Sequence, residues 1–271
     1  MNKSVLTLSG MLLALFCACS TNPFTGKQNF NIVSNDAIFP TAFQQYDQFL
    51  TENKVVKGTA QATMVKNVGQ KIKAAAEKYL NSVGQSAYLS GYDWEYNLVD
   101  SKDVNAWCMP GGKIVVYTGI LPITKDEAGL ATVMGHEVAH ALLNHGAQRM
   151  SRETVAQLGA AGVGAATANK SASSQQIFQQ AYGLGAQYGA ILPFSRSNEN
   201  EADEIGLTLM AIAGYNPDKA LEFWKRMDAN SGGSEPMEFM STHPSGSTRI
   251  SKITSEIPKA KAQAAKFGVK F

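Results

Sequence analysis

The chain has 271 residues, of which 44% are hydrophobic, and its formal net charge is +2. That length allows one sizeable core, or a core with an appendage. The small charge argues against a nucleic-acid-binding protein, as does the lack of any run of basic residues interleaved with aromatic ones.

The first 18 residues are predicted to be a secretory signal. Lys3 precedes an apolar stretch that runs to Phe16, and small residues follow it. This order is typical of a signal peptide, and the apolar stretch is too short to span a membrane. The segment resembles bacterial lipoprotein signals, in which a lipid-modified cysteine follows a small residue, as Cys19 follows Ala18 here. We expect cleavage before Cys19 and its lipidation; ordinary secretion of a soluble product is the alternative.

A lipid on Cys19 would anchor the protein in the cell envelope. By resemblance to known bacterial lipoproteins, Ser20 is not an inner-membrane retention signal, which favours the periplasmic face of the outer membrane. Cys108 would remain as the only free thiol, so no internal disulfide is expected. The sequence sets no oligomeric state.

Residues 19–58 are predicted to form a tether, rich in Asn, Thr, Gly and Pro, followed by a helical segment over 36–53 that contains Pro40. Residues 59–80 form an amphipathic helix, because apolar residues recur there at spacings of three and four. These residues are Val65, Val68, Ile72, Ala75 and Tyr79.

Two strands are predicted over 93–99 and 113–118, with a turn-forming segment at 105–112 between them. They would make a small sheet. The second strand is expected to be an exposed edge that holds an extended peptide by strand addition. Its residues are Lys113, Ile114, Val115, Val116 and Tyr117.

The apolar segment over 134–143 contains the pattern His-Glu-x-x-His, a signature of zinc peptidases. Successive helical residues turn by about 100°, so His136 and His140 share a face and can bind one zinc ion. Glu137 flanks that face and is the candidate general base that takes a proton from water. A buried helix with incidental histidines is the alternative, which the charge of Glu137 disfavours.

The segment Thr124-Lys125-Asp126-Glu127 resembles a capping box, with Ile123 as a hydrophobic staple, and predicts a helix start near Lys125.

The Ala/Gly-rich segment after this helix is expected to pack closely on other helices or to form a mobile lid. Ser195 or Ser197 is expected to cap a later helix. The further predicted helices span 151–168, 175–192, 198–213, 218–228 and 247–257. These elements indicate an α+β class, mostly helical, with one main domain over 59–257 and a tail over 258–271.

A catalytic zinc site with two histidines needs a third protein ligand. On a continued helix, His145 would point away from His136, so we interpret it as structural or as a residue behind the ligands. Glu199 and Asp203 share a face of a later helix, where one could bind zinc and the other could orient a ligand histidine. Glu201 is expected to face elsewhere. These acids could equally serve a first helical turn, so the residues alone leave the third ligand open.

Together these motifs resemble the gluzincin family that includes the CAAX prenyl endoprotease, mitochondrial OMA-type proteases and bacterial periplasmic BepA-like peptidases. Members have Glu-x-x-x-Asp on a later helix, and this chain has Glu199-Asn200-Glu201-Ala202-Asp203. The resemblance also covers the strand region 105–116, and Thr242-His243-Pro244 with Arg249.

The resemblance implies a zincin-like fold with a small sheet beside the zinc helix. It implies one Zn²⁺ per chain, held by His136, His140 and Glu199, with Asp203 as the orienting acid. It also implies that His243 and Arg249 face the active site, where they stabilise the oxyanion or cover the metal.

The leading hypothesis is therefore a zinc-dependent endopeptidase that is lipid-anchored and cleaves extracytoplasmic polypeptides, namely misfolded or unassembled envelope proteins. The alternative is a chaperone-like module that binds unfolded envelope proteins, with a structural or regulatory zinc closed by His243. Glu137 favours the enzyme, because a structural site needs no general base. Membrane insertion by the Ala/Gly-rich helices is disfavoured by their short apolar runs.

Overall fold

The computed structural model describes residues 19–31, 34–151, 195–230, 237–243 and 247–271. The predicted signal at 1–18 lies outside the described residues. So do the predicted helix over 175–192 and all but the first residue of the one over 151–168. The described part is mostly helical with a small sheet, which confirms the predicted class. No helix in this part is long and apolar enough to cross a membrane.

The sheet contains four strands in the order β3-β4-β6-β5. β6 lies parallel to β4 and antiparallel to β5, and β3 is antiparallel to β4. The strands are β3 (Val55–Val56), β4 (Glu95–Val99), β5 (Ala106–Met109) and β6 (Lys113–Tyr117).

The prediction that residues 113–117 form an exposed edge is wrong, because β6 is paired on both sides and all five of its residues are buried. The run Ile114-Val115-Val116 suits a strand covered on both faces. Among the described strands the edges are β3 and β5, and β5 lies in the segment interpreted as turn-forming. Only the end of that segment turns, where Gly111 and Gly112 have φ of 85° and 88°.

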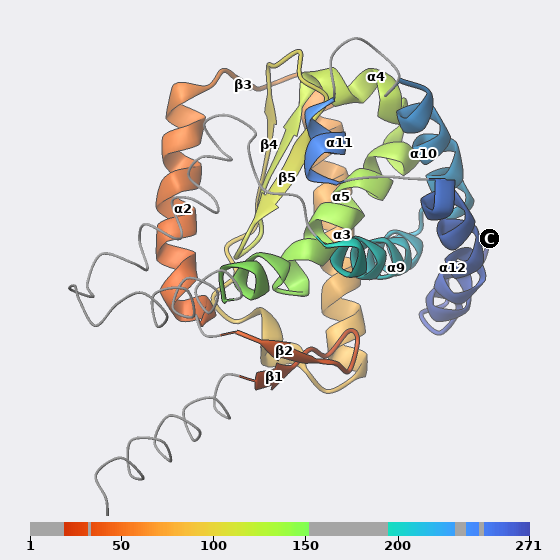
Figure 1. Ribbon diagram of the computed structural model, residues 1–271. Coiled ribbons are helices and arrows are strands. Elements are labelled where there is room, and N and C mark those ends of the chain that lie inside the picture. Colours follow the sequence, from red (N-terminus) through yellow and green to blue (C-terminus); the bar gives the residue numbers. More distant parts are fainter. Residues whose placement is uncertain (1–18, 32–33, 152–194, 231–236, 244–246) are drawn as a thin grey trace, which may run out of the picture.

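Helices cover the two faces of the sheet separately (Figure 1). Val115 and Tyr117 pack with α2 (Asn35–Glu52), whereas Ile114 and Val116 pack with α3 (Ala60–Ser82) and with α5 (Glu127–Leu142). This alternation follows from the two-residue repeat of a strand. β3 pairs with β4, so residues on both sides of the expected boundary at 58 contribute to this sheet.

The zinc helix α5 (Glu127–Leu142) begins later than predicted. Thr124 ends the short α4 (Leu121–Thr124), which follows the 3₁₀ turn η2 (Thr118–Ile120). Lys125 then takes a φ of 66°, and Asp126 becomes the N-cap by accepting a hydrogen bond from Gly129 N at 2.8 Å. A capping residue two positions further on therefore replaces the expected box.

Four helices follow in the described C-terminal part. Ser195 caps α9 by accepting from Asn198 N, as one of the two predicted caps. A short helix, α11, was not predicted. The last helix runs past Ile257, because Ala260 and Ala264 extend its buried face, so the predicted tail is largely helical. The bounds are α9 (Arg196–Ile212), α10 (Asp218–Asn230), α11 (Glu238–Thr242) and α12 (Ser247–Ala265).

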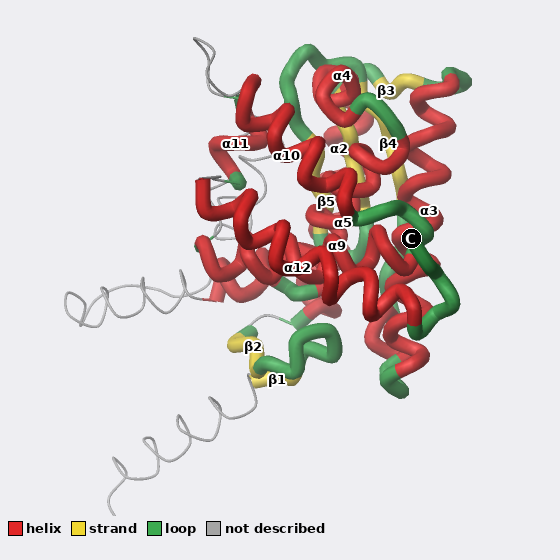
Figure 2. The backbone as a smooth tube through the Cα atoms, turned by 90° about the vertical axis from the view of Figure 1, so that its right-hand side faces the viewer, coloured by secondary structure: helices red, strands yellow, loops and turns green. Residues whose placement is uncertain are grey.

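The segment expected to be a tether forms a hairpin of β1 (Cys19–Thr21) and β2 (Gln28–Phe30). Figure 2 shows this N-terminal hairpin packed below the helical body. Its Phe24 ring is buried and stacks on Tyr79 of α3 at 4.9 Å between centroids. The 3₁₀ turn η1 (Ser86–Leu89) supplies Tyr88, whose ring meets Phe24 edge-on.

Candidate metal centre

The close crossing of α5 and α9 brings the two halves of the site together. A Cβ on Gly135 would lie 2.9 Å from Gly206 O, and a Cβ on Gly206 would lie 2.9 Å from His136 N. Only glycine fits at both positions without moving a backbone. The two helices can therefore approach closely enough for side chains from each to meet.

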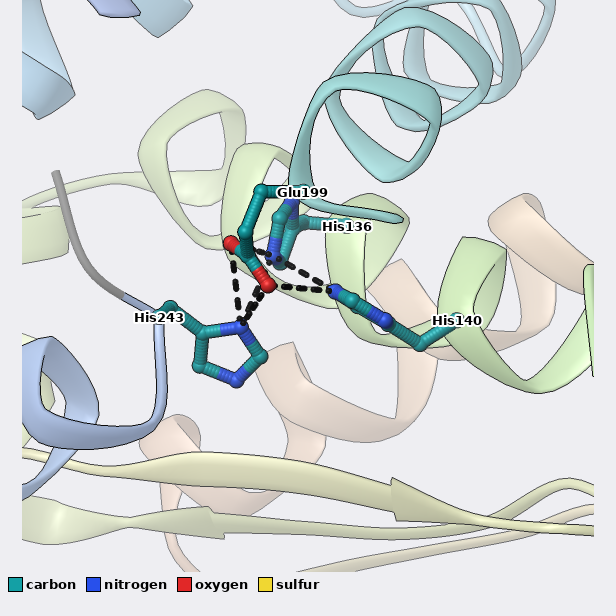
Figure 3. A group of neighbouring side chains, drawn as sticks. All are labelled: His136, His140, Glu199 and His243. Carbon is teal, nitrogen blue, oxygen red and sulfur yellow. Dashed lines mark hydrogen bonds and ion pairs between the residues drawn. The ribbon is translucent and has the colours of Figure 1, made fainter. Parts of the chain in front are cut away.

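Four buried side chains converge beside this crossing (Figure 3). His136 and His140 come from α5, Glu199 from the first turn of α9, and His243 from the end of α11. Nε2 of His136 lies 3.1 Å from Nε2 of His140 and 3.2 Å from Nδ1 of His243. Oε1 of Glu199 lies 3.3 Å from Nε2 of His140 and 3.1 Å from Nδ1 of His243.

These spacings fit a tetrahedral zinc ion. Bonds of 2.0–2.1 Å from zinc to nitrogen or oxygen place neighbouring ligand atoms about 3.3 Å apart. The ring nitrogens also point at one another, which hydrogen bonds alone cannot satisfy for three imidazoles. The donor set of imidazole nitrogen and carboxylate oxygen suits zinc. The residues therefore fit one zinc ion, and all three predicted ligands belong to the cluster, joined by His243.

Asp203 holds the outer nitrogen of His136. Its Oδ1 lies 2.9 Å from His136 Nδ1, which leaves Nε2 of that ring for the metal. Arg249 donates to both carboxylate oxygens of Asp203, at 2.7 Å and 2.9 Å, and its guanidinium lies 3.5 Å from the ring centroid of Trp224. Because its donors are used in this way, Arg249 positions Asp203. Its Nη2 also lies 3.4 Å from Oε2 of Glu199, and the oxyanion role expected as one alternative for Arg249 stays a prediction.

Glu137 faces the cluster from α5 and is nearly inaccessible to solvent. Burial raises the pKa of its carboxyl to about 7; the nearby charge of Glu199 adds to this and that of His243 opposes it. His243 Nε2 lies 3.3 Å from Glu137 Oε1, but this oxygen has no hydrogen-bond partner among the described residues. A buried carboxylate oxygen without a partner, beside a metal-binding cluster, suits a general base that would accept a proton from water.

Two of the ligands, Glu199 and His140, have protonation states that suit metal binding. Burial alone would raise the pKa of Glu199, but the three surrounding histidines outweigh it and hold the pKa well below its usual range. Burial lowers the pKa of His140 well below its usual range. An ionised carboxylate and a neutral imidazole are the forms that bind zinc. Burial would lower the pKa of His136, but its hydrogen bonds with Asp203 and Glu199 outweigh burial and raise it in the metal-free site.

His145 does not point away from the ligands, because the helix on which that expectation depended ends at Leu142. Asn144 takes a φ of 56°, and a new helical stretch begins at His145. As a result, His145 Nδ1 lies 3.0 Å from His140 Nδ1. Glu201 faces away from the cluster, as expected, and contacts His145 Nε2 at 3.3 Å. This hydrogen bond, with that from Lys27, lowers the pKa of Glu201 to about 2.

Several residues that build the site were missed in the sequence. Gly135 and Gly206 were missed because they carry no ligand atom. A glycine inside each of two helices was nevertheless a signal that the helices pack closely. Lys27 lies over a hundred residues before the metal-binding motif and had no signal at all. Trp224 falls on the buried face of α10 and is indistinguishable in sequence from an ordinary core residue.

Comparison with known proteins adds the family context. A family model described as Peptidase family M48 matches residues 66–257, which contain every member of the cluster. The chain is 32% identical over 244 residues to the mitochondrial metalloendopeptidase OMA1 of Schizosaccharomyces pombe, covering 89% of this chain and 67% of that protein.

Two further relatives are a mitochondrial protease and a bacterial protease. The chain is 33% identical over 177 residues to the mitochondrial metalloendopeptidase OMA1 of Homo sapiens, covering 64% of this chain and 34% of the relative. It is 30% identical over 182 residues to the beta-barrel assembly-enhancing protease of Yersinia pestis, covering 64% and 37%. The chain thus spans about one third to two thirds of the length of these curated relatives.

Proposed function

The chain belongs to peptidase family M48 and has the zinc site of a metallopeptidase, and on this premise we propose that it is an endopeptidase that cleaves unfolded envelope proteins. The observation that carries the proposal is the buried carboxylate of Glu137 beside the four-residue cluster, whose Oε1 has no hydrogen-bond partner among the described residues. A zinc site with a purely structural role has no use for a buried base at this place.

The protein's own residues supply positioning and proton transfer. Zinc in the cluster would act as a Lewis acid that polarises a carbonyl and acidifies water. Glu137, with a pKa raised to about 7, takes a proton from the attacking water and returns it to the leaving amine. Asp203 and Arg249 fix the orientation of His136 behind the metal.

His243 would close the site in this conformation. Its Nδ1 lies 3.2 Å from Nε2 of His136 and 3.1 Å from Oε1 of Glu199, so it would serve as a fourth protein ligand where a catalytic zinc ion needs a position for water. His243 leads into a segment that begins with Pro244 and reaches α12. We propose that catalysis requires His243 to leave the ligand position.

We propose β5, in place of β6, as the strand that binds the peptide. Asn105 O accepts from Tyr117 N of β6. The backbone groups of an antiparallel strand face its partner at every second residue, so those of Trp107 and Met109 also face β6. The backbone groups of Ala106 and Cys108 then face the other side, where no described strand pairs. Val104 O, on that same side, accepts from Phe239 N of α11, which brings the edge close to His243. An extended substrate added to β5 would pass beside the cluster.

We also propose that the protein is a lipoprotein with signal peptide 1–18, anchored through Cys19 and acting at the periplasmic face of the outer membrane. The lipoprotein-like order of Lys3, the apolar stretch and Cys19 supports this. The beta-barrel assembly-enhancing protease among the relatives is compatible with envelope substrates. Misfolded or unassembled envelope proteins are extended chains of the kind that an edge strand can bind.

The test is cleavage of casein or of an unfolded outer-membrane protein by wild type, Glu137→Gln and chelator-treated protein. His243→Ala is included because the wild-type site would be closed in this conformation. We expect cleavage that the chelator abolishes, that zinc restores and that Glu137→Gln lacks. Binding of unfolded protein without cleavage by either wild type or His243→Ala would favour the chaperone-like alternative.

A further inference from the structure

The end of the zinc helix is held by side chains from other parts of the chain. Leu142 O accepts from Asn22 Nδ2 at 2.9 Å and from Tyr88 Oη at 2.7 Å. Leu143 O accepts from Asn29 Nδ2 at 3.0 Å. Terminal carbonyls of a helix need such partners when they are buried. Two of these donors belong to the N-terminal hairpin, so the hairpin fixes the point at which the zinc helix stops.

The chain turns directly after this point. Asn144 takes the left-handed conformation, which asparagine tolerates better than most residues. The turn places His145 against the outer side of His140, with 3.0 Å between their Nδ1 atoms. His145 is completely buried. Its position depends on the helix end and not on helical periodicity.

The hydrogen bonds around His145 have one consistent direction. Nε2 of His140 faces the cluster, so its Nδ1 carries the proton and donates to Nδ1 of His145. Nε2 of His145 then carries a proton and donates to Oε2 of Glu201 at 3.3 Å. Lys27 Nζ, from the N-terminal hairpin, donates to the other oxygen of Glu201 at 2.6 Å. In this series of hydrogen bonds each donor therefore faces an acceptor.

We propose that His145, Glu201 and Lys27 form a positioning relay for the zinc ligand His140. The relay fixes the ring orientation and the tautomer of His140, as Asp203 does directly for His136. The relay differs from the direct contact of Asp203 with His136, because the imidazole of His145 lies between the ligand His140 and the carboxylate of Glu201. The relay also connects the N-terminal hairpin to the metal centre through Lys27. The inference depends on the metal centre and not on the substrate.

The test measures zinc affinity of the full-length protein by competition with a fluorescent chelator, and the absorption spectrum of the cobalt-substituted protein. His145→Leu should weaken zinc affinity about 10- to 100-fold, the usual effect of losing such a partner, and should change the cobalt spectrum. His145→Asn should recover much of the affinity, because its side-chain oxygen can replace Nδ1 as acceptor from His140. Glu201→Ala should weaken affinity less than His145→Leu.

The matched control is Glu204→Ala, which removes an exposed acid from the same helix and should change neither signal. In the His145→Asn background, Glu201→Ala should have no further effect, because the link to Glu201 is already broken. Wild-type zinc affinity and cobalt spectrum in His145→Leu would overturn the proposal. Equal losses in His145→Leu and His145→Asn would also overturn it, by assigning His145 a merely structural role. Neither readout requires peptidase activity, so the inference and the proposed function fail separately.

Discussion

Glu137→Gln should stabilise the metal-free protein at alkaline pH. Burial raises the pKa of Glu137 to about 7 from an ordinary value of 4.5, so the folded protein holds this proton more tightly than the unfolded chain. Stability is therefore lost as pH rises from 4.5 to 7, where the unfolded chain ionises first. This difference in pKa corresponds to about 3 kcal/mol. Glutamine has the same shape without the charge and removes that cost.

Urea unfolding of the chelator-treated proteins at pH 4 and pH 8 measures the effect. We expect equal stability at pH 4 and a more stable Glu137→Gln variant, by up to about 3 kcal/mol, at pH 8. Glu204→Gln changes an exposed acid and serves as the control. Its stability relative to wild type should be the same at the two pH values. Zinc should reduce the difference, because a nearby cation favours the ionised form of Glu137. The reasoning is refuted if wild type is the more stable protein at pH 8.

Three other changes have defined outcomes. His243→Ala should raise the cleavage rate with zinc retained if His243 covers the metal, whereas loss of an oxyanion donor would lower kcat about 10²- to 10³-fold; a rate within twofold of wild type would contradict both roles. Gly206→Ala should lower the melting temperature and the zinc content together, since its Cβ would lie 2.9 Å from His136 N. Gly214→Ala is strained by a φ of 92° but has open space around its Cβ, so it should lower the melting temperature and leave the zinc content unchanged. Cys19→Ala should release the protein from the membrane fraction, and mass spectrometry should find a diacylglycerol-modified Cys19 in wild type; an unmodified N-terminus would contradict the lipoprotein proposal.

The parts of the site that depend on local periodicity were predictable. His136 and His140 are four residues apart on one helix, and so are Glu199 and Asp203, so helical geometry alone places each pair on one face. The helical type of both segments was predicted as well, although the cap of α5 is Asp126 in place of the expected Thr124. That the two pairs face each other came from the family resemblance.

The parts that depend on contacts between distant segments were not predictable. Strand order put β6 inside the sheet, although its sequence fits a strand at any position. His145 reaches His140 because side chains of the N-terminal hairpin and of η1 bind the carbonyl that ends the helix, and because the chain turns at Asn144. Arg249 binds Asp203 because α12 packs along α9, which no local pattern indicates.

Zinc content of purified Glu199→Ala protein tests the central claim most directly. The claim is that one zinc ion is held at the crossing of α5 and α9 by His136, His140 and Glu199. Metal analysis should find close to one zinc per chain in wild type and in Glu204→Ala, and a sharp loss in Glu199→Ala and His140→Ala. Near-stoichiometric zinc in Glu199→Ala, with loss in Glu201→Ala instead, would contradict the assignment of the third ligand.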